Sequence, residues 1–216
     1  MRFSKFKGII FDLDGTLITS SHVWSDIDIK FLAKRGLNVP ENYFKAVSTM
    51  NFTAAAEYTN NLFNLNEKIE DIAAEWHEMA YDEYAHHISL KKGAKDFLNF
   101  LKENGVKLAL ATAASKELFE AVLKNNQVYE LFDFFASTND VKRGKGFPDV
   151  YEYACKGMGL KSNECAVFED IIEGIRGAKA GGFTAVACLD KHYIADWEDM
   201  KKESDFYFEA YKELIV

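Results

Sequence analysis

The sequence predicts an α/β fold in which a doubly wound parallel sheet carries an inserted all-helical segment. Three observations support this: an apolar strand pattern near the N-terminus, a helical stretch after it, and alternating helix and strand patterns in the second half. With 216 residues and 48% hydrophobic composition, the chain can bury a substantial core. The length suits one large domain, or a domain with an insertion.

The first strand is expected at residues 8–11, an apolar run that ends in a cluster of Asp and Gly. From about residue 22 to residue 87, apolar side chains recur at the three- and four-residue spacing of a helix. Breaks at 36–40 and 60–66 are expected to separate these helices.

After residue 93, helix-like and strand-like patterns alternate, which implies a parallel sheet covered on both faces. The expected helices are about 94–104, 116–125, 149–158 and 173–180, and the expected strands are 107–112, 134–137, 165–168 and 184–188. The sequence therefore divides into an α/β core, 1–19 and 88–216, and a helical insertion, 20–87.

The charge and cysteine patterns limit the classes of partner. The chain has 34 acidic and 26 basic residues, a formal net charge of -8, with no long block of one sign. An acidic surface repels polyphosphate backbones, so nucleic acid is not an expected partner. No apolar run reaches membrane-spanning length and no signal segment is recognisable, so we expect no membrane and a cytoplasmic location. Cys155, Cys165 and Cys188 are expected to be reduced core thiols.

The most specific motif directly follows the first strand and reads Phe11-Asp12-Leu13-Asp14-Gly15-Thr16-Leu17. At a strand end, two carboxylates two residues apart can both face the crevice where open α/β sheets bind ligands. One can attack phosphorus, while the other donates a proton to the leaving group and then activates water. Gly15 allows a sharp turn. The motif therefore favours hydrolysis of a phosphate monoester.

Two other interpretations of this motif are open from the residues alone. The aspartates could simply form a turn after the strand, or they could begin a calcium-binding loop. A calcium loop has its Gly later, a distal bidentate Glu and flanking helices, whereas this motif follows an apolar strand.

The motif resembles that of the haloacid dehalogenase superfamily, whose phosphotransferases carry Asp-x-Asp-Gly-Thr after the first strand. The resemblance implies a Rossmann-like core and an α-helical C1 cap formed by the insertion, which closes over the site and selects the substrate. It also implies that Asp12 is the nucleophile and that Asp14 is the proton donor and acceptor.

A candidate for the second motif of the family lies at the end of the second core strand. Thr112 and Ala113 close the segment Leu108-Ala109-Leu110-Ala111-Thr112-Ala113. The resemblance implies that they bind the phosphate, Thr112 by a hydrogen bond. Taken alone, a Thr at a strand end is more often a cap or turn residue.

The third motif is a lysine. Lys145 stands before Pro148-Asp149, where the family has a Lys that binds phosphate and bridges to the nucleophile, offsetting negative charge. Gly146-Phe147 departs from the usual Lys-Pro, and Lys142 and Arg143 are rival cations. A lone loop lysine would otherwise be a solvated surface charge.

The fourth motif is the acidic pair Glu169-Asp170, which follows an apolar strand. The family uses such a pair to hold Mg²⁺, which prefers oxygen ligands. The resemblance implies a metal site made by Asp12, the backbone carbonyl of Asp14, and Asp170, with Glu169 bound directly or through water.

Within the superfamily, the chain is similar to the β-phosphoglucomutase and phosphoglycolate phosphatase subfamily. The mutases usually have an Arg where this chain has Thr49 and a His where it has Trp24, so both positions are expected to contact substrate. Their identities favour a Mg²⁺-dependent phosphatase acting on a small phosphorylated metabolite, with a mutase as the alternative. A non-catalytic sensor is a third hypothesis, but it would be expected to lose Asp12, Asp14 or Asp170. We expect a monomer.

Overall fold

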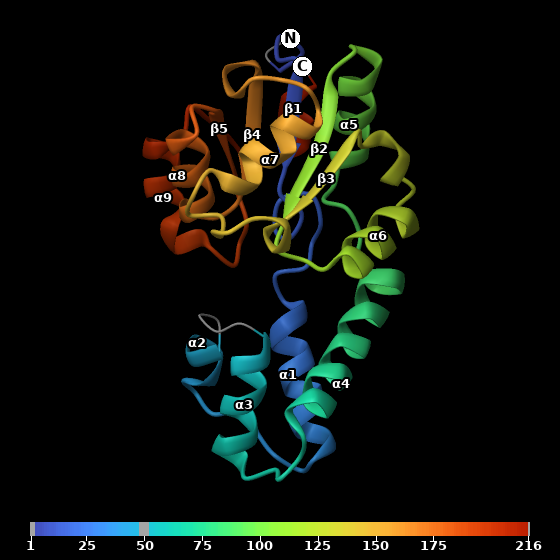
Figure 1. Cartoon of the computed structure of the whole chain (residues 1–216), viewed down its shortest axis with the longest axis vertical. Coiled ribbons are helices and arrows are strands. Elements are labelled where there is room, and N and C mark those ends of the chain that lie inside the picture. The colour runs from blue at the N-terminus through green and yellow to red at the C-terminus, as the bar shows by residue number, and fades with distance from the viewer. Residues whose placement is uncertain (1–2, 48–51, 216) are drawn as a thin grey trace. The chain divides into compact units, whose positions relative to one another are not determined.

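The computed structural model describes residues 3–47 and 52–215. The chain forms two compact units, Met1–Ser21 with Ile88–Val216, and His22–His87. The first contains a sheet flanked by helices and the second is helical (Figure 1). Within the described ranges, we find no helix that is both long enough and apolar enough to cross a membrane.

The sheet has six strands, each parallel to its neighbours, in the order β3-β2-β1-β4-β5-β6. The strands are β1 (Gly8–Phe11), β2 (Lys107–Thr112), β3 (Phe134–Ser137), β4 (Cys165–Glu169), β5 (Thr184–Cys188) and β6 (Phe206–Phe208). This topology confirms the predicted doubly wound α/β fold. Because β1 lies between β2 and β4, the segments that follow these three strands meet at one edge of the sheet.

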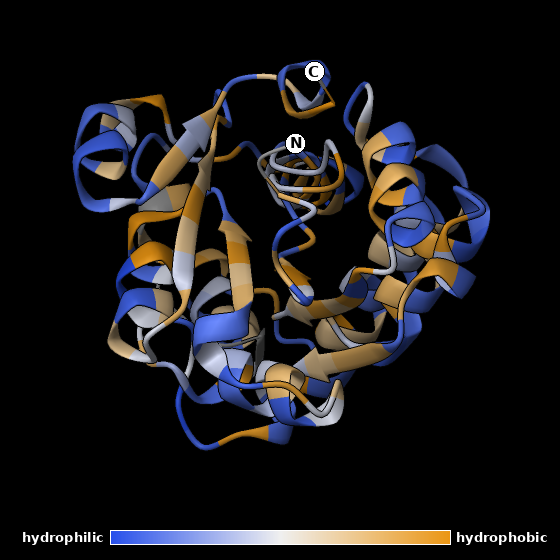
Figure 2. Cartoon of the chain, turned by 90° about the horizontal axis from the view of Figure 1, so that it is seen from above, coloured by the Kyte–Doolittle hydropathy of each residue, from blue (hydrophilic) through white to orange (hydrophobic). Residues whose placement is uncertain are grey.

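Helices pack on both faces of the sheet, and alternate strand residues serve the two faces. Ile10 and Val167 belong to the core on the face that α7 (Asp149–Gly157) and α8 (Ile172–Ala180) cover. Phe11 and Phe168 turn to the other face, where their rings lie 4.8 Å apart beside Phe97 of α5. In Figure 2 the strands are mainly apolar, while the helices carry both apolar and hydrophilic stripes. The helices of this unit are α5 (Ala94–Glu103), α6 (Lys116–Asn125), α7 (Asp149–Gly157), α8 (Ile172–Ala180) and α9 (Trp197–Glu203).

The expected elements of this unit agree with the structure to within about a residue, except at its C-terminal end. The sequence pattern predicted no element after β5, whereas the chain forms α9 and the edge strand β6. Strand β6 has only three residues, and its central Tyr207 is exposed, so it shows too little alternation to be recognised.

The helical unit contains α1 (Val23–Lys34), α2 (Tyr43–Val47), α3 (Phe52–Phe63), α4 (Ile69–Asp82) and a π-helical turn, Glu83–His87. The predicted break at 60–66 was wrong in part, because residues 60–63 continue α3. Asn60, which suggested a turn, lies inside the helix, and its side chain bonds both backbone groups of Glu67 across the connection, at 3.0 and 3.2 Å. A polar side chain can thus order a loop without interrupting its own helix.

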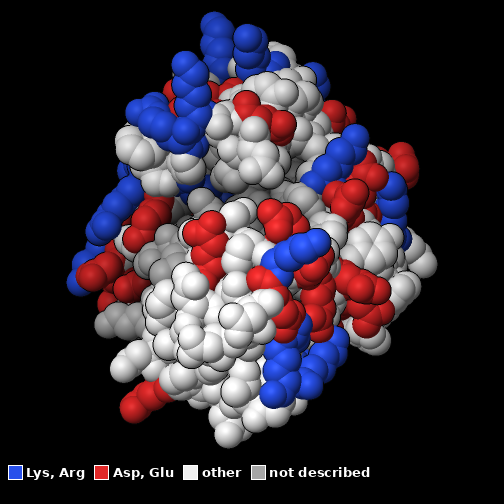
Figure 3. Space-filling view, turned by 60° about the horizontal axis from the view of Figure 1, so that its bottom comes forward, with Lys and Arg blue, Asp and Glu red and all other residues white. Residues whose placement is uncertain are grey.

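Ion pairs and ring contacts tie the helices of this unit together. Arg35, at the end of α1, binds Glu67 through two nitrogens, both at 2.7 Å, and Glu75 of α4 at 2.8 Å. Its guanidinium also lies 3.6 Å from the ring centroid of Phe31, which packs edge to face on Trp76. On the face that Figure 3 presents, acidic and basic side chains are intermixed.

The three cysteines are buried and unbridged, as expected of core thiols. Burial raises the pKa of Cys188 to about 12, and the sulfurs of Cys155 and Cys165 lie 3.6 Å apart. Thiols with a raised pKa are poor nucleophiles.

Candidate active site

Three buried carboxylates meet where β1 and β4 end. Phe11 pairs with Phe168 in the strand register, and the amide of Asp12 donates to the carbonyl of Phe168 at 3.0 Å. This register places Asp12 beside Glu169 and Asp170. One oxygen from each carboxylate lies within 4.8 Å of the others. The sheet topology therefore brings together two motifs that are more than 150 residues apart in sequence.

Lys145 enters this cluster from the loop before α7. Its Nζ forms ion pairs with Asp12 Oδ1 and with Glu169 Oε1, the latter at 2.8 Å. Burial by itself would lower the pKa of Lys145, but the charges of Asp12 and Glu169 outweigh it and hold that pKa above its ordinary value. Lys145 is thus a cation with only 11% of its side chain exposed. Its rival Arg143 is exposed and pairs with Asp149 at 2.6 Å.

The loop backbone at Lys145 also lies close to α8. A Cβ added at Gly177 would lie 2.0 Å from the carbonyl oxygen of Lys145, so only glycine allows this approach. The close packing fixes the loop against the helix that follows the acidic pair.

The acidic pair is more buried than carboxylates usually are. Burial, with the charge of Asp12, raises the pKa of Glu169 to about 7, although Lys145 opposes the shift. Burial and the charges of Asp12 and Glu169 raise the pKa of Asp170 well above its usual value. Glycines allow both side chains to fit: a Cβ at Gly15 would lie 2.0 Å from Asp170 Oδ2, and one at Gly174 would lie 2.5 Å from Glu169 Oε2.

The residues at this site fit a magnesium ion. Among the described residues, Glu169 Oε2 and Asp170 Oδ2 are buried without a hydrogen-bond donor. Buried anionic oxygens without a partner are costly, and a cation would compensate them. Hard oxygen donors are the ligands that Mg²⁺ prefers.

Two hydroxyl groups hold the carboxylates that follow β1 and β4. Ser20 Oγ donates to Asp14 Oδ1 at 2.7 Å, and Thr16 Oγ1 donates to Asp170 Oδ1 at 3.1 Å. From the sequence, Ser20 had no predicted role, and Thr16 stood out only as part of the motif. Thr16 could have been found from its place in the motif, whereas Ser20 carries no local signal.

The structure places Thr112 at the end of β2, the neighbour of β1, so it lies at the same sheet edge as Asp12. Thr112 is fully buried, and its Oγ1 accepts a hydrogen bond from the amide of Ala114 at 2.9 Å. A threonine hydroxyl that accepts one bond can still donate another. Ala113 is exposed next to it.

Tyr151, for which the sequence predicted no role, also contacts the site. Its hydroxyl donates to Glu169 Oε1 at 2.9 Å. Its position three residues after Pro148, on an apolar helix face, gave it the appearance of an ordinary core aromatic.

The two expected substrate contacts in the insertion remain predictions. Trp24 lies on α1 of the helical unit and is 41% exposed. Thr49 falls outside the described residues.

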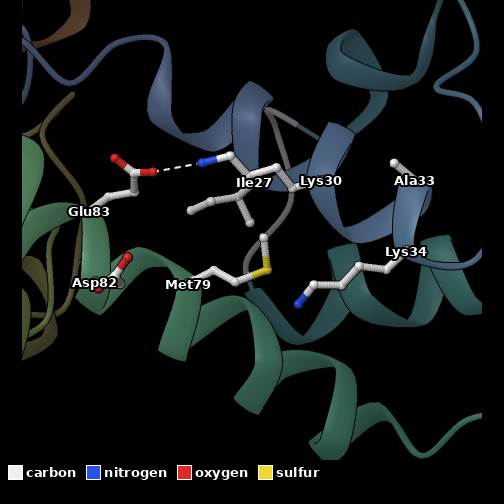
Figure 4. Close-up of a pocket in the computed structure, with 7 residues that line it drawn as sticks. All are labelled: Ile27, Lys30, Ala33, Lys34, Met79, Asp82 and Glu83. Carbon is white, nitrogen blue, oxygen red and sulfur yellow. Dashed lines mark hydrogen bonds and ion pairs between the residues drawn. The ribbon is translucent and has the colours of Figure 1, made fainter.

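The helical unit has a cavity of about 460 Å³ between α1 and α4 (Figure 4). Its lining is Ile27, Lys30, Ala33, Lys34, Met79, Asp82 and Glu83. Lys30 pairs with Glu83 at 2.7 Å and Lys34 pairs with Glu75 at 2.8 Å, so these lysines are already neutralised by carboxylates. This cavity contains none of the predicted site residues.

Together, the fold and the carboxylate–lysine cluster describe a doubly wound α/β protein with a candidate catalytic centre at the ends of its central strands. The sequence pattern of the haloacid dehalogenase-like hydrolases matches residues 6–182, and the chain belongs to this family. The chain is 26% identical over 188 residues to the validoxylamine A 7'-phosphate phosphatase of Streptomyces hygroscopicus subsp. limoneus, covering 87% of each protein.

Two further proteins are similar over most of this chain. A bifunctional riboflavin kinase/FMN phosphatase of Arabidopsis thaliana is 28% identical over 181 residues, and the match covers 83% of this chain but only 47% of that protein. A putative β-phosphoglucomutase from Thermotoga maritima has the same fold, with a TM-score of 0.80, 19% identity and 96% of each chain covered.

Proposed function

We propose that this protein is a magnesium-dependent phosphatase that hydrolyses a small phosphate monoester, such as a sugar phosphate, through an aspartyl-phosphate on Asp12. The observation that carries the proposal is the position of Asp12, buried between the cation of Lys145 and an acidic pair with unpartnered oxygens. Two relatives support the reaction class: a validoxylamine A 7'-phosphate phosphatase and a bifunctional riboflavin kinase/FMN phosphatase.

In the first step, a carboxylate oxygen of Asp12 attacks phosphorus, and the bond from phosphorus to the ester oxygen breaks. The carboxyl group of Asp14 gives its proton to the departing oxygen. Lys145 and the hydroxyl of Thr112 bind phosphoryl oxygens, and the lysine offsets the negative charge that accumulates as one anion approaches another.

In the second step, a water molecule attacks phosphorus of the aspartyl-phosphate. The carboxylate of Asp14 takes a proton from this water, the bond between phosphorus and Asp12 breaks, and phosphate is released. The hydrogen bond from Ser20 holds Asp14 in one orientation for both proton transfers.

The ligands for Mg²⁺ in this proposal are Asp12, the backbone carbonyl of Asp14, and Asp170, with Glu169 bound directly or through water. Because Glu169 Oε1 already accepts from Lys145 and Tyr151, only its other oxygen is unpartnered. When bound, the cation would neutralise negative charge shared by the carboxylates and the phosphoryl group.

The helical unit is proposed to be the cap that selects the substrate, with Trp24 and Thr49 among its substrate contacts. A phosphoglucomutase is the alternative, since a putative enzyme of that name has the same fold. The residues at positions 24 and 49 differ from those the mutases usually carry, and this favours water as the acceptor. A monomer in the cytoplasm is the simplest form for such an enzyme.

The test is magnesium-dependent phosphate release from a panel of sugar phosphates, phosphoglycolate and nucleotides. β-Glucose 1-phosphate, with a bisphosphate primer, is also assayed for glucose 6-phosphate. We expect phosphate release that the isosteric Asp12→Asn variant lacks while it stays folded. Equal release by that variant would refute the proposal, and isomerisation without release would establish the mutase.

A further inference from the structure

The hydroxyl of Tyr151 is completely buried and bonds a residue of the candidate site. Its ring lies in the core beside Phe183, with centroids 6.3 Å apart and planes at 68°. Its hydroxyl donates to Glu169 Oε1 at 2.9 Å. Burial, with the charges of Glu169 and Asp12, raises the pKa of Tyr151 well above its usual value, so the hydroxyl keeps its proton. It therefore acts as a donor.

The same oxygen of Glu169 also faces Lys145. Nζ of Lys145 lies 2.8 Å from Oε1, and Lys145 also contacts Asp12. Oε1 thus takes one bond from the lysine and one from the tyrosine, which fixes the plane of the carboxylate. Terminal torsions of glutamate are broad and roughly two-fold, so a single bond would leave this plane free to turn.

Helix α7 fixes both ends of this arrangement. Asp149, its first residue, binds Arg143 at 2.6 Å and so anchors the loop that carries Lys145. Tyr151, two residues further along α7, holds the carboxylate of Glu169, with which Lys145 pairs. A shift of α7 would therefore move the lysine and its partner together.

We propose that Tyr151 is a positioning residue which, through Glu169, holds Lys145 against Asp12. The expected effect of Tyr151 on kcat rests on the proposed phosphatase function, because Lys145 is then the group that offsets negative charge during phosphoryl transfer. Its structural consequence does not: without the hydroxyl, Glu169 turns and Lys145 leaves Asp12.

The test compares Tyr151→Phe with Tyr153→Phe, a matched control on the same helix whose ring is 40% exposed and stacks edge to face on Phe134. Removing a hydrogen bond to a charged group lowers kcat by roughly tenfold to hundredfold when the bond acts fully in the transition state. We expect that loss for Tyr151→Phe only. The Mg²⁺ concentration for half-maximal rate should rise as well, but by less than kcat falls, because Glu169 turns while Asp12 and Asp170 remain in place.

Two further measurements separate positioning from a general structural role. In a Lys145→Arg background, Tyr151→Phe should lose most of its effect on kcat, because the group that it positions is already altered. A crystal structure of Tyr151→Phe should show Glu169 rotated and Lys145 moved away from Asp12, whether or not a substrate has been found.

The proposal is overturned if Lys145 stays against Asp12 in that crystal structure. It is equally overturned if an active wild type loses no more kcat with Tyr151→Phe than with Tyr153→Phe. A wild type that releases no phosphate from any ester would refute the proposed function instead, and the crystal structure would still decide the role of Tyr151.

Discussion

Replacing Asp170 by Asn should stabilise the metal-free protein while abolishing its response to Mg²⁺. Asp170 shares a buried cluster with two other carboxylates, with one oxygen of each within 4.8 Å. At that distance, two like charges repel by about 3.5 kcal/mol for an effective dielectric constant of about 20. Lys145 offsets part of this repulsion through Asp12 and Glu169. We therefore expect a net gain of about 1–3 kcal/mol in the free energy of unfolding, since Asn keeps the oxygen that accepts from Thr16.

The assay is thermal unfolding with and without saturating Mg²⁺. For a chain of this size, about 1 kcal/mol corresponds to a shift of roughly 2–4 °C, so Tm of the metal-free variant should rise by about 2–12 °C. Mg²⁺ at about 100 times its Kd would stabilise the wild type by about 2.7 kcal/mol and leave Tm of the variant unchanged.

The exposed substitution Asp199→Asn serves as the control and should retain the Mg²⁺ shift. The reasoning fails if metal-free Asp170→Asn unfolds at a lower temperature than the wild type. A Mg²⁺ shift that persists in this variant would refute the assigned metal site.

Three other perturbations test separate parts of the structure. Gly15→Ala places a Cβ 2.0 Å from Asp170 Oδ2 at a positive φ of 75°, so it should cost at least about 1–2 kcal/mol and remove the Mg²⁺ shift in thermal unfolding. Burial, opposed by a hydrogen bond from Tyr43, raises the pKa of Asp28 to about 7 from 3.8. The folded state therefore binds this proton more tightly than the unfolded state does. The stability that the bound proton contributes is lost as pH rises from about 4 to about 7. The free energy of unfolding of Asp28→Asn, measured with urea, should thus match that of the wild type near pH 4 and exceed it by about 4 kcal/mol at pH 8. Lys91→Met removes the partner, 3.1 Å away, of the mostly buried Asp190 and should cost about 2–3 kcal/mol by the same assay; an unchanged midpoint would contradict this.

The parts of the site that could be predicted are those with a local signature at a strand end. Asp12 and Asp14 follow an apolar strand, and the pair Glu169-Asp170 follows another. Parallel pairing of β1 with β4 then brings the two motifs together. Lys145 could be placed only by the resemblance, because a loop lysine has no periodicity of its own.

The parts that could not be predicted depend on contacts between distant residues. Tyr151 looks like a core aromatic because its ring is one, and only the position of its hydroxyl reveals its bond to Glu169. Ser20 reaches Asp14 because the chain turns sharply at Gly15, whose φ is 75°. A pattern based on spacing records which residues are apolar, but it does not record where a single hydroxyl points.

The most direct test of the central claim is to trap the covalent intermediate. The wild type, turning over its best ester with Mg²⁺, is quenched in acid, digested and analysed by mass spectrometry. We predict the added mass of one phosphoryl group on Asp12, lost on treatment with hydroxylamine and absent from Asp12→Asn. A phosphoryl group on another residue, or water oxygen that enters the Asp12 carboxylate during turnover, would contradict the account.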